Sequence, residues 1–247
     1  MTYQMTVSPD FSPRHIAGWY IFNTWLQKTL GEDIHLELYQ DFESQRKSIR
    51  EDKIDLIYAN PFDASMLIRE KGFIALARPL GKEDEVVIAV PANSPVNKVE
   101  ELQSGLRLAF TDDPNVHLVG MIMLEPANLS SENIRLQMVD SYAVVAKQLL
   151  RGEADAGIFL KEAFYGLSSL TRREMRPLVE SQISDIFHAF LVGPRLADKK
   201  DAIQDALVRM TETPGGRSVL EALGIAGWAN VSREDAEFMV DLMDAIR

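Results

Sequence analysis

The amino-acid sequence predicts an α/β fold in two lobes, each a mixed, mostly parallel sheet flanked by helices. Short apolar runs alternate along the chain with longer stretches of helical periodicity, which is the pattern of βα units. The alternation occurs in two similar sets, and two apolar segments, residues 87–92 and 189–193, are placed to cross between them. We therefore expect a first lobe of residues 1–88 plus 192–247, a second lobe of residues 89–191, and two hinge segments that join them.

The first set begins with a strand and continues with alternating helices and strands. Its predicted strands are apolar runs at residues 1–8, 34–39, 54–58, 73–77 and 85–90. The first helix begins near Pro13, a residue that suits the first helical turn, and ends at Gly31. A short charged helix is predicted at residues 43–51, and a further helix begins at Asn60 and ends at Gly72.

The second set repeats this order and leads into a helical C-terminal part. Its predicted helices and strands are residues 98–103, 106–110, 115–125, 134–139, 140–152 and 156–160. A strand at residues 186–192 then returns from this set. The predicted C-terminal helices are residues 199–211, 216–223 and 232–246. Ser232 and Asp235 form a capping pattern at the start of the last helix.

The composition indicates a folded globular protein. Hydrophobic residues make up 46% of the 247 residues, which is typical of this class. The net charge of −11 disfavours contact with nucleic-acid phosphates, so no nucleic-acid partner is expected. The apolar stretches fall short of the roughly 20 residues that span a bilayer, so no direct membrane insertion is expected. Residues 1–7 lack the features of a signal peptide, which leaves two expectations: a periplasmic protein if a leader was removed, and otherwise a cytoplasmic one.

Enzyme and metal sites are not predicted. The chain has no cysteine, which excludes thiolate nucleophiles and cysteine-ligated metals. No two of the histidines, His15, His35, His117 and His188, have the i, i+4 spacing of a helical zinc site. The motifs G-x-S-x-G, G-x-x-x-x-G-K-[ST] and G-x-G-x-x-G are absent as well. We expect a binding protein with no catalytic residue, no metal and no cofactor.

Candidate ligand-binding residues lie in the loops that leave the carboxyl ends of the predicted strands, where two-lobed binders hold a small-molecule ligand. They are Asp10, Phe11, Ser12, Arg14, His15, Tyr58, Asn60, Phe62, Thr111, Asp112, Asn115, His117, Ser141, Tyr142 and Phe159. Arg14 is suited to pair with a carboxylate or phosphate on the ligand. Ser12, Asn60 and Ser141 also fit a purely structural role as helix N-caps, and Asp112 fits that of a turn residue.

Five segments, in this order over nearly the whole chain, match the pattern of one known family. They are SPDFSP at residues 8–13, KIDLIYANPF at 53–62, residues 96–102 with LRLAFTDDPN at 106–115, QLLRGEADAGI at 148–158, and residues 213–224. The sequence thereby resembles the phosphate, phosphite and phosphonate solute-binding proteins of ABC transporters, which have the type II periplasmic-binding-protein fold. The resemblance implies a protein that closes an interlobe cleft around a phosphonate-like, phosphate-like or other small polar ligand and delivers it to a membrane permease.

Two departures from that family's pattern bear on the ligand. Family members that bind phosphonates typically carry a Ser/Thr-rich turn whose hydroxyls and helix amides hold the oxyanion, whereas residues 111–117 here read TDDPNVH. Residues 140–142 read DSY where family members often have a histidine. The acidic loops favour a ligand with a cationic group, or a zwitterion that also uses Arg14.

Two other functions stay open at this point. The same closure would serve a cytoplasmic or membrane-associated sensing module that reports to a signalling protein. An enzyme on the same fold is the second alternative, because a fold does not fix a function.

Overall fold

The chain divides into two compact units in the computed structural model, Met1–Glu83 with Phe187–Asp244, and Asp84–Ile186. The structure describes residues 2–11, 13–82 and 84–245. The divisions fall a few residues before the boundaries that the sequence predicts. The two apolar segments expected to cross between lobes are strands inside the units, because β5 (Val86–Pro91) pairs with two strands of the second unit and β10 (Ala189–Val192) with two strands of the first.

The first unit contains a mixed sheet in the order β11-β4-β10-β3-β1-β2. Its other strands are β1 (Tyr3–Val7), β2 (Ile34–Glu37), β3 (Leu56–Ala59), β4 (Ile74–Pro79) and β11 (Trp228–Asn230). β1 is parallel to β2 and β3, whereas β10 runs antiparallel between β3 and β4. Ala189 therefore pairs with Ala59, and the start of β10 lies beside the end of β3.

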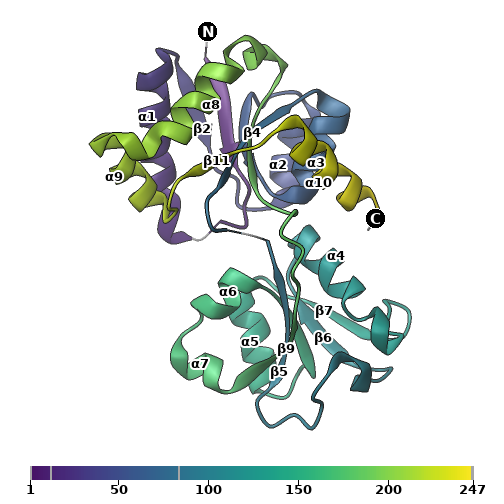
Figure 1. Ribbon diagram of the computed structural model, residues 1–247. Coiled ribbons are helices and arrows are strands. Elements are labelled where there is room, and N and C mark those ends of the chain that lie inside the picture. Colours follow the sequence, from purple (N-terminus) through teal and green to yellow (C-terminus); the bar gives the residue numbers. More distant parts are fainter. Residues whose placement is uncertain (1, 12, 83, 246–247) are drawn as a thin grey trace. The chain divides into compact units, whose positions relative to one another are not determined.

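Helices cover both faces of this sheet (Figure 1). They are α1 (Ile16–Leu30), α2 (Phe42–Arg50), α3 (Pro61–Lys71), α8 (Lys200–Val208), α9 (Pro214–Leu223) and α10 (Arg233–Ala245). Figure 1 shows α1, α8 and α9 on one side and α2, α3 and α10 on the other. The contact between α1 and α9 is close, because a Cβ on Gly18 would lie 2.2 Å from the carbonyl oxygen of Ala222.

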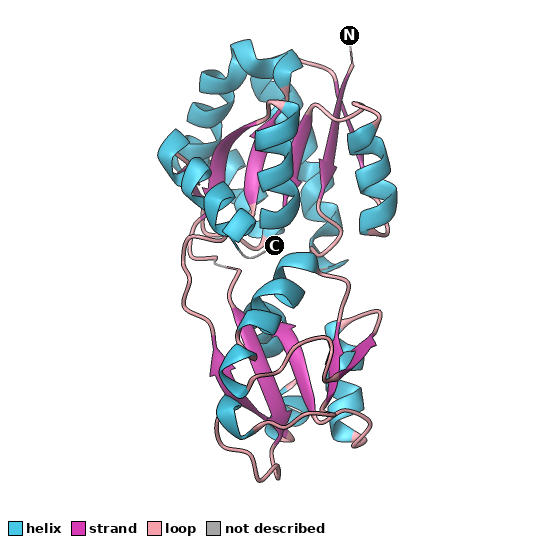
Figure 2. Ribbon diagram, turned by 90° about the vertical axis from the view of Figure 1, so that its right-hand side faces the viewer, coloured by secondary structure: helices cyan, strands magenta, loops and turns pink. Residues whose placement is uncertain are grey.

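The second unit contains a five-stranded mixed sheet in the order β7-β6-β8-β5-β9. Its elements besides β5 are β6 (Arg107–Phe110), α4 (Pro114–Ile122), β7 (Arg135–Met138), α5 (Tyr142–Leu150), β8 (Ala156–Leu160), α6 (Lys161–Gly166), α7 (Ser169–Arg173) and β9 (Met175–Glu180). β6 is parallel to β7 and β8, and β5 is antiparallel to β8 and β9. The layers of both units are visible in Figure 2, where the strands lie between helices.

Short 3-10 helices complete the secondary structure. They are η1 (Pro13–His15), η2 (Val99–Glu101), η3 (Glu125–Ala127), η4 (Pro194–Lys199) and η5 (Arg209–Glu212).

Several local signals confirm the sequence predictions, and one region shows their limit. Gly31 and Gly72 adopt left-handed conformations at the ends of α1 and α3. Ser232 Oγ accepts a hydrogen bond from the Asp235 N–H, and Asp235 accepts one from the Ser232 N–H, which confirms the predicted cap.

Residues 161–185, where no element was predicted, hold α6, α7 and β9. These helices are too short to show a helical period, and β9 is an edge strand that contains a proline.

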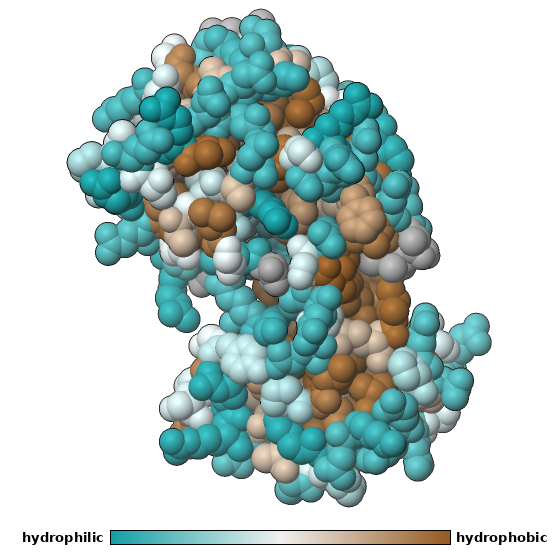
Figure 3. Space-filling view, viewed as in Figure 1, coloured by the Kyte–Doolittle hydropathy of each residue, from teal (hydrophilic) through white to brown (hydrophobic). Residues whose placement is uncertain are grey.

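Hydrophilic side chains cover most of the face shown in Figure 3, with hydrophobic side chains between them. In the described part of the chain, every helix is too short or too polar to cross a bilayer.

Candidate functional site

A hydrogen-bonded network lies where β1 and β3 end in the first unit. Asn60 caps α3, because its Oδ1 accepts a hydrogen bond from the Asp63 N–H at 2.8 Å. The Asn60 Nδ2 donates to Ser8 Oγ at 3.0 Å and to Asp63 Oδ2 at 2.9 Å. Arg46 of α2 donates to both oxygens of the buried Asp63, at 2.7 and 3.0 Å. Both amide hydrogens of Asn60 are therefore donated within the protein. The Asn60 side chain links the loops that follow β1 and β3 to the start of α3.

A second buried carboxylate, Asp10, follows β1 in the same unit. Its Oδ2 lies 3.0 Å from Nε2 of His188, and only 5% of the Asp10 side chain and 10% of the His188 side chain are exposed. Burial alone would raise the pKa of Asp10, but the charge of His188 and hydrogen bonds from His188 and Ser8 outweigh it, so the pKa of Asp10 lies below its usual value. The other oxygen, Oδ1, is buried with no hydrogen-bond partner among the described residues. The His188 ring stacks on Tyr58 with centroids 5.2 Å apart.

In the second unit, α4 and α5 begin just after the carboxyl ends of β6 and β7. Asp113 caps α4 and accepts the Val116 N–H at 3.5 Å, while its Oδ2 accepts a hydrogen bond from the Tyr142 hydroxyl at 2.8 Å. Ser141 caps α5 by accepting the Val144 N–H at 3.4 Å. The first turns of both helices are therefore partly satisfied by side chains of the protein itself.

Buried polar atoms without a hydrogen-bond partner in the described residues gather around the start of α4. They are Thr111 Oγ1, Asn115 Oδ1, Asn115 Nδ2 and His117 Nδ1. Each unpartnered buried group costs about 1–3 kcal/mol. Burial lowers the pKa of His117, which favours its neutral form, and its ring stacks on Phe110 at 4.2 Å. Unmet hydrogen-bonding capacity of this kind is available to a ligand or to ordered water.

The predicted site residues of the first unit fall into a linked group and several residues outside it. Asp10, Tyr58 and Asn60 are linked through Ser8 and His188. The others are Phe11, half-buried against the core; Arg14, exposed; His15, whose Nδ1 is 3.3 Å from the Ala222 carbonyl oxygen; and Phe62, whose ring lies under Arg46 at 5.0 Å. Ser12 lies outside the described residues.

In the second unit the structure brings Thr111, Asn115, His117, Ser141 and Tyr142 to the starts of α4 and α5. The other two predicted residues differ. Asp112 is exposed on the turn. Phe159 is fully buried in the core, stacked on Tyr142 at 6.1 Å and against Phe164 at 5.3 Å. Ligand contact by any of these residues stays a prediction.

The sequence interpretation missed His188 and the Arg46–Asp63 pair. His188 belongs to the run 186–192, which is otherwise apolar and was assigned to a strand as a whole. The sequence signal that could have identified His188 is that it is the single polar residue within that run. Arg46 and Asp63 occupy separate helices, and no local pattern relates them.

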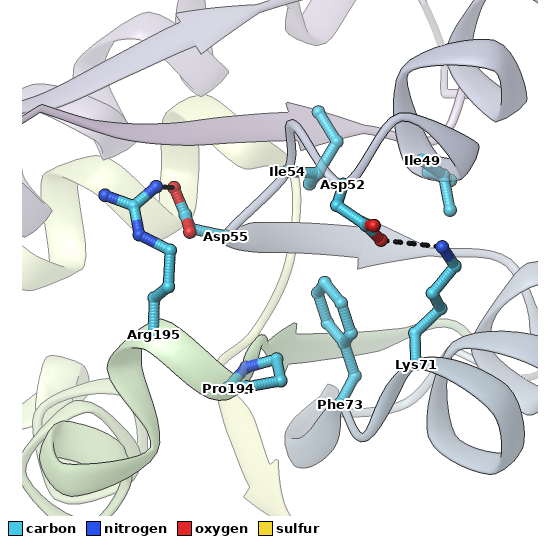
Figure 4. Close-up of a pocket in the computed structure, with 8 residues that line it drawn as sticks. All are labelled: Ile49, Asp52, Ile54, Asp55, Lys71, Phe73, Pro194 and Arg195. Atoms are coloured by element: carbon cyan, nitrogen blue, oxygen red, sulfur yellow. Dashed lines mark hydrogen bonds and ion pairs between the residues drawn. The ribbon is translucent and has the colours of Figure 1, made fainter.

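A pocket lies at the opposite end of the first unit's sheet, before β3 and after β10 (Figure 4). It is lined by Ile49, Asp52, Ile54, Asp55, Lys71, Phe73, Pro194 and Arg195. Both of its cations are paired, Lys71 with Asp52 at 2.6 Å and Arg195 with Asp55 at 3.0 Å. No predicted site residue lines this pocket. Within the described residues, no cluster of three or more metal-ligating side chains occurs.

The sequence matches the family of ABC transporter, phosphonate, periplasmic substrate-binding proteins over residues 5–236. The chain belongs to this family. The match confirms the predicted resemblance and, with it, the function of a solute-binding protein of an ABC transporter. The family is a periplasmic one and is not an enzyme family, so it gives no support to the cytoplasmic alternative. No curated protein sequence matches the chain.

Three solved structures with the same fold are named for phosphonate or sulphonate binding. PhnD1 from Prochlorococcus marinus, in complex with methylphosphonate, has a TM-score of 0.82 at 13% identity, and the match covers 99% of this chain and 98% of that one. A binding protein component of an ABC phosphonate transporter from Pseudomonas aeruginosa has a TM-score of 0.76 at 15% identity, covering 100% and 89%. The aliphatic sulphonate binding protein SsuA from Escherichia coli has a TM-score of 0.65 at 16% identity, covering 99% and 87%. The predicted two-lobed type II periplasmic-binding-protein fold is thereby confirmed.

Proposed function

We propose that this protein binds a small solute with an oxyanion group, a phosphonate or a sulfonate, and presents it to the permease of an ABC-type transporter. Family membership supports the transport role, and the ligands named for PhnD1 and SsuA support the oxyanion class. Within the chain, the residues at the carboxyl ends of the strands are the candidates for contact with the solute.

The observation that carries the proposal is the set of partnerless polar atoms at the start of α4. Thr111 Oγ1 and Asn115 Nδ2 are hydrogen-bond donors, and both lie within one turn of the helix start, where the helix dipole also favours negative charge. A solute oxyanion that accepts their hydrogen bonds would remove a cost that the free protein carries.

Two carboxylates in the turn before α4 restrict the class of solute further. Asp113 lies at the start of α4 and Asp112 is exposed next to it. A negative charge beside the oxyanion would oppose binding, unless the solute also carries a positive group. A zwitterion such as an aminoalkyl phosphonate or an aminoalkyl sulfonate satisfies both conditions, so we expect it to bind more tightly than the unsubstituted alkyl anion.

Calorimetric titration and thermal unfolding with a panel of solutes test this proposal. The panel contains methylphosphonate, inorganic phosphate, ethanesulfonate, 2-aminoethylphosphonate and taurine, with arginine and choline as cationic comparisons. A true ligand at 100 times its dissociation constant should stabilise the protein by about 2.7 kcal/mol. Binding of a cation but of no oxyanion would overturn the proposed class, and a response to none of these solutes would overturn the proposal as a whole.

A matched pair of variants ties binding to α4. Asn115→Leu removes both partnerless atoms at a buried position, whereas Asn133→Leu makes the same change where the amide is hydrogen-bonded to Ser130 and Asn128. We expect affinity to fall at least tenfold in the first variant and to stay within twofold in the second. Equal affinity in both would show that the solute does not contact Asn115.

Closure of the two lobes around the solute remains a sequence-based prediction. Small-angle X-ray scattering with and without a saturating solute tests it, and a decrease in the radius of gyration is expected on binding. Export to the periplasm and delivery to a permease belong to the same proposal. Fractionation of the native host checks the first, and solute uptake after deletion of the protein checks the second.

A further inference from the structure

We infer that the pocket of the first unit is a second binding site, which takes a small zwitterion with an apolar body, the chemistry of an amino acid with a branched side chain. The pocket lies at the opposite end of the sheet from the loops that hold the candidate site residues. The inference goes beyond the proposed function and does not depend on it. It is carried by Asp55, which directly precedes β3.

Asp55 is buried, and hydrogen bonds hold it in one position. Its N–H donates to the Gln4 carbonyl oxygen at 2.8 Å, and its own carbonyl oxygen accepts the Gly193 N–H at 2.7 Å. The side-chain Oδ2 accepts hydrogen bonds from the Gln4 N–H at 2.9 Å and from Arg195 at 3.0 Å. Only 3% of the side chain is exposed. The carboxylate is therefore fixed in place before any ligand arrives.

The second carboxylate oxygen of Asp55 takes no part in these bonds. No hydrogen bond from the described residues reaches Oδ1, and Figure 4 shows this oxygen pointing into the pocket, toward Pro194. A carboxylate oxygen that is withdrawn from water without a donor lowers the stability of the protein. An ammonium group in the pocket would supply that donor through a charge-assisted hydrogen bond.

The corresponding carboxylate of the second unit shows how much of this arrangement the fold requires. Asp155 also directly precedes a strand, β8, and its Oδ2 accepts the Arg107 N–H at 2.9 Å, as the Oδ2 of Asp55 does with Gln4. Both oxygens of Asp155 are paired, because the Arg107 guanidinium donates to them at 3.1 and 2.6 Å. The structural role that the two residues share therefore requires one oxygen only, which leaves Asp55 Oδ1 for a ligand.

Apolar side chains form much of the pocket and set the size of the ligand. They are Ile49, Ile54, Phe73 and Pro194. The Phe73 ring packs against the backbone, since a Cβ on Gly193 would lie 3.0 Å from it. The cavity measures about 170 Å³. A cavity of about 150 Å³ holds benzene, so a branched aliphatic side chain fits this pocket, whereas a drug-sized molecule does not.

The charges around the pocket favour a ligand with no net charge. Figure 4 shows Asp55 with Arg195 on one side and Asp52 with Lys71 on the other. These two acids and two bases balance, so a lone cation or a lone anion would leave an uncompensated charge. A zwitterion leaves none, because its ammonium meets Asp55 and its anionic group meets Lys71. The Lys71 Nζ donates to Asp52 and to the Arg50 carbonyl oxygen, and it has a third hydrogen to donate.

Calorimetric titration with leucine tests the inference, because leucine has both charges and a branched apolar side chain. Three analogues each lack one feature: N-acetyl-leucine lacks the ammonium, isopentylamine lacks the carboxylate, and glycine lacks the side chain. We expect saturable binding of leucine and binding of each analogue that is weaker by about tenfold or more. Absence of leucine binding, or an analogue that binds as tightly as leucine, would overturn the inference.

Two matched pairs of variants assign the binding to this pocket. Asp55→Asn keeps an oxygen for the hydrogen bonds within the protein but turns an amide N–H₂ group toward the pocket, and Asp205→Asn makes the same change at an exposed position in α8. Lys71→Met removes a cation of the pocket, and Lys28→Met removes an exposed one from α1. We expect affinity for leucine to fall about tenfold in Asp55→Asn and about fivefold in Lys71→Met, and to stay within about twofold in both controls. Unchanged affinity in both pocket variants would contradict the inference.

The variant Asn115→Leu separates this inference from the proposed function. It should weaken the binding of methylphosphonate and leave that of leucine unaltered, whereas Asp55→Asn should do the reverse. Leucine binding that depends on Asn115 but not on Asp55 would show that leucine occupies the candidate site of the second unit, and the inference would fail. If leucine binds in the pocket and no oxyanion binds, the proposed function fails and the inference stands.

Backbone amide NMR of the wild type needs no variant to fold. Leucine should shift the amide signals of Asp52, Asp55 and Phe73 and leave those of Thr111 and Asn115 in place. Signals of the first three residues that do not move would overturn the inference.

Discussion

The two sheet edges that hold the candidate site residues bury polar groups in different ways. In the first unit, the buried carboxylates of Asp63 and Asp10 have basic partners, Arg46 and His188, although Asp10 Oδ1 has no hydrogen-bond partner among the described residues. In the second unit, Thr111 and Asn115 are buried with side-chain polar atoms that have no partner among the described residues. The first edge is organised before a solute arrives, whereas the second retains hydrogen-bonding capacity that a solute could use.

The difference has a source in the elements that approach each edge. In the first unit, α2 brings the basic Arg46 toward α3, where it meets Asp63. In the second unit, Asp113 at the start of α4 accepts a hydrogen bond from the Tyr142 hydroxyl. A neutral hydroxyl compensates a carboxylate less strongly than a guanidinium does.

The largest expected effect comes from removing the cation of the first edge. Arg46→Met should lower the free energy of unfolding of the first unit by about 3 kcal/mol, because it leaves Asp63 buried without a counter-charge. Trp19, Trp25 and Trp228 all lie in this unit, so tryptophan fluorescence during urea unfolding reports on it alone. Arg50→Met, an exposed position on the same helix, is the control and should change stability by no more than about 0.5 kcal/mol.

A buried carboxylate of the second unit that accepts several hydrogen bonds extends the comparison between the two units. Glu85 is 4% exposed and accepts hydrogen bonds from the Ser181 hydroxyl and from the N–H groups of Ile183, at 2.7 Å, and Ser184, at 2.9 Å. Glu85→Gln should cost about 2 kcal/mol, because hydrogen bonds to a charged group are lost and an amide group opposes donors. Amide hydrogen exchange at Ile183 and Ser184 should rise.

The exposed Glu153 provides the control for this change. Glu153→Gln should leave exchange at both amides unaltered. Unchanged exchange in Glu85→Gln would show that the backbone around Ser184 holds its conformation without the carboxylate.

A change of opposite sign is expected at the second edge. Asn115→Leu should stabilise the unliganded protein by about 1 kcal/mol, because it removes two buried polar atoms that have no partner. Asn133→Leu should instead destabilise it by about 1 kcal/mol, because it breaks two hydrogen bonds. Thermal unfolding followed by circular dichroism measures both. Destabilisation by Asn115→Leu would contradict the contrast drawn between the edges.

The smallest effect concerns pH. The pKa of Asp10 is lower in the folded than in the unfolded protein, so its ionised form stabilises the fold above its ordinary pKa of 3.8, and this contribution is lost as the pH falls through the folded value. The stability difference between the wild type and Asp10→Asn should therefore shrink as the pH falls into the acid range. Urea unfolding followed by tryptophan fluorescence at several pH values measures it, and a difference that grows in acid would contradict this sign.

Much of the fold could be predicted because its signals are local. The glycines that end α1 and α3 and the caps Asn60, Ser141 and Ser232 act within a few residues of themselves. Elements with weak local signals, such as β9 and the three-residue β11, were not predicted. The candidate site could be predicted only in part, because a loop position does not reveal whether a side chain points outward. Phe159 illustrates this limit, since it was assigned to the loop that leaves a strand but lies within β8 and is buried in the core.

The sequence by itself determined the order of most helices and strands, the ends of several helices and the family. These depend on residue spacing, on backbone preference and on contacts between neighbours in the chain. Only the tertiary structure decided which distant groups meet, as with Asp10 and His188 or Arg46 and Asp63. The reason is that β10 enters the first sheet antiparallel beside β3. Its register sets His188 at the edge where β1 and β3 end, and nothing within the run of residues 186–192 encodes that register.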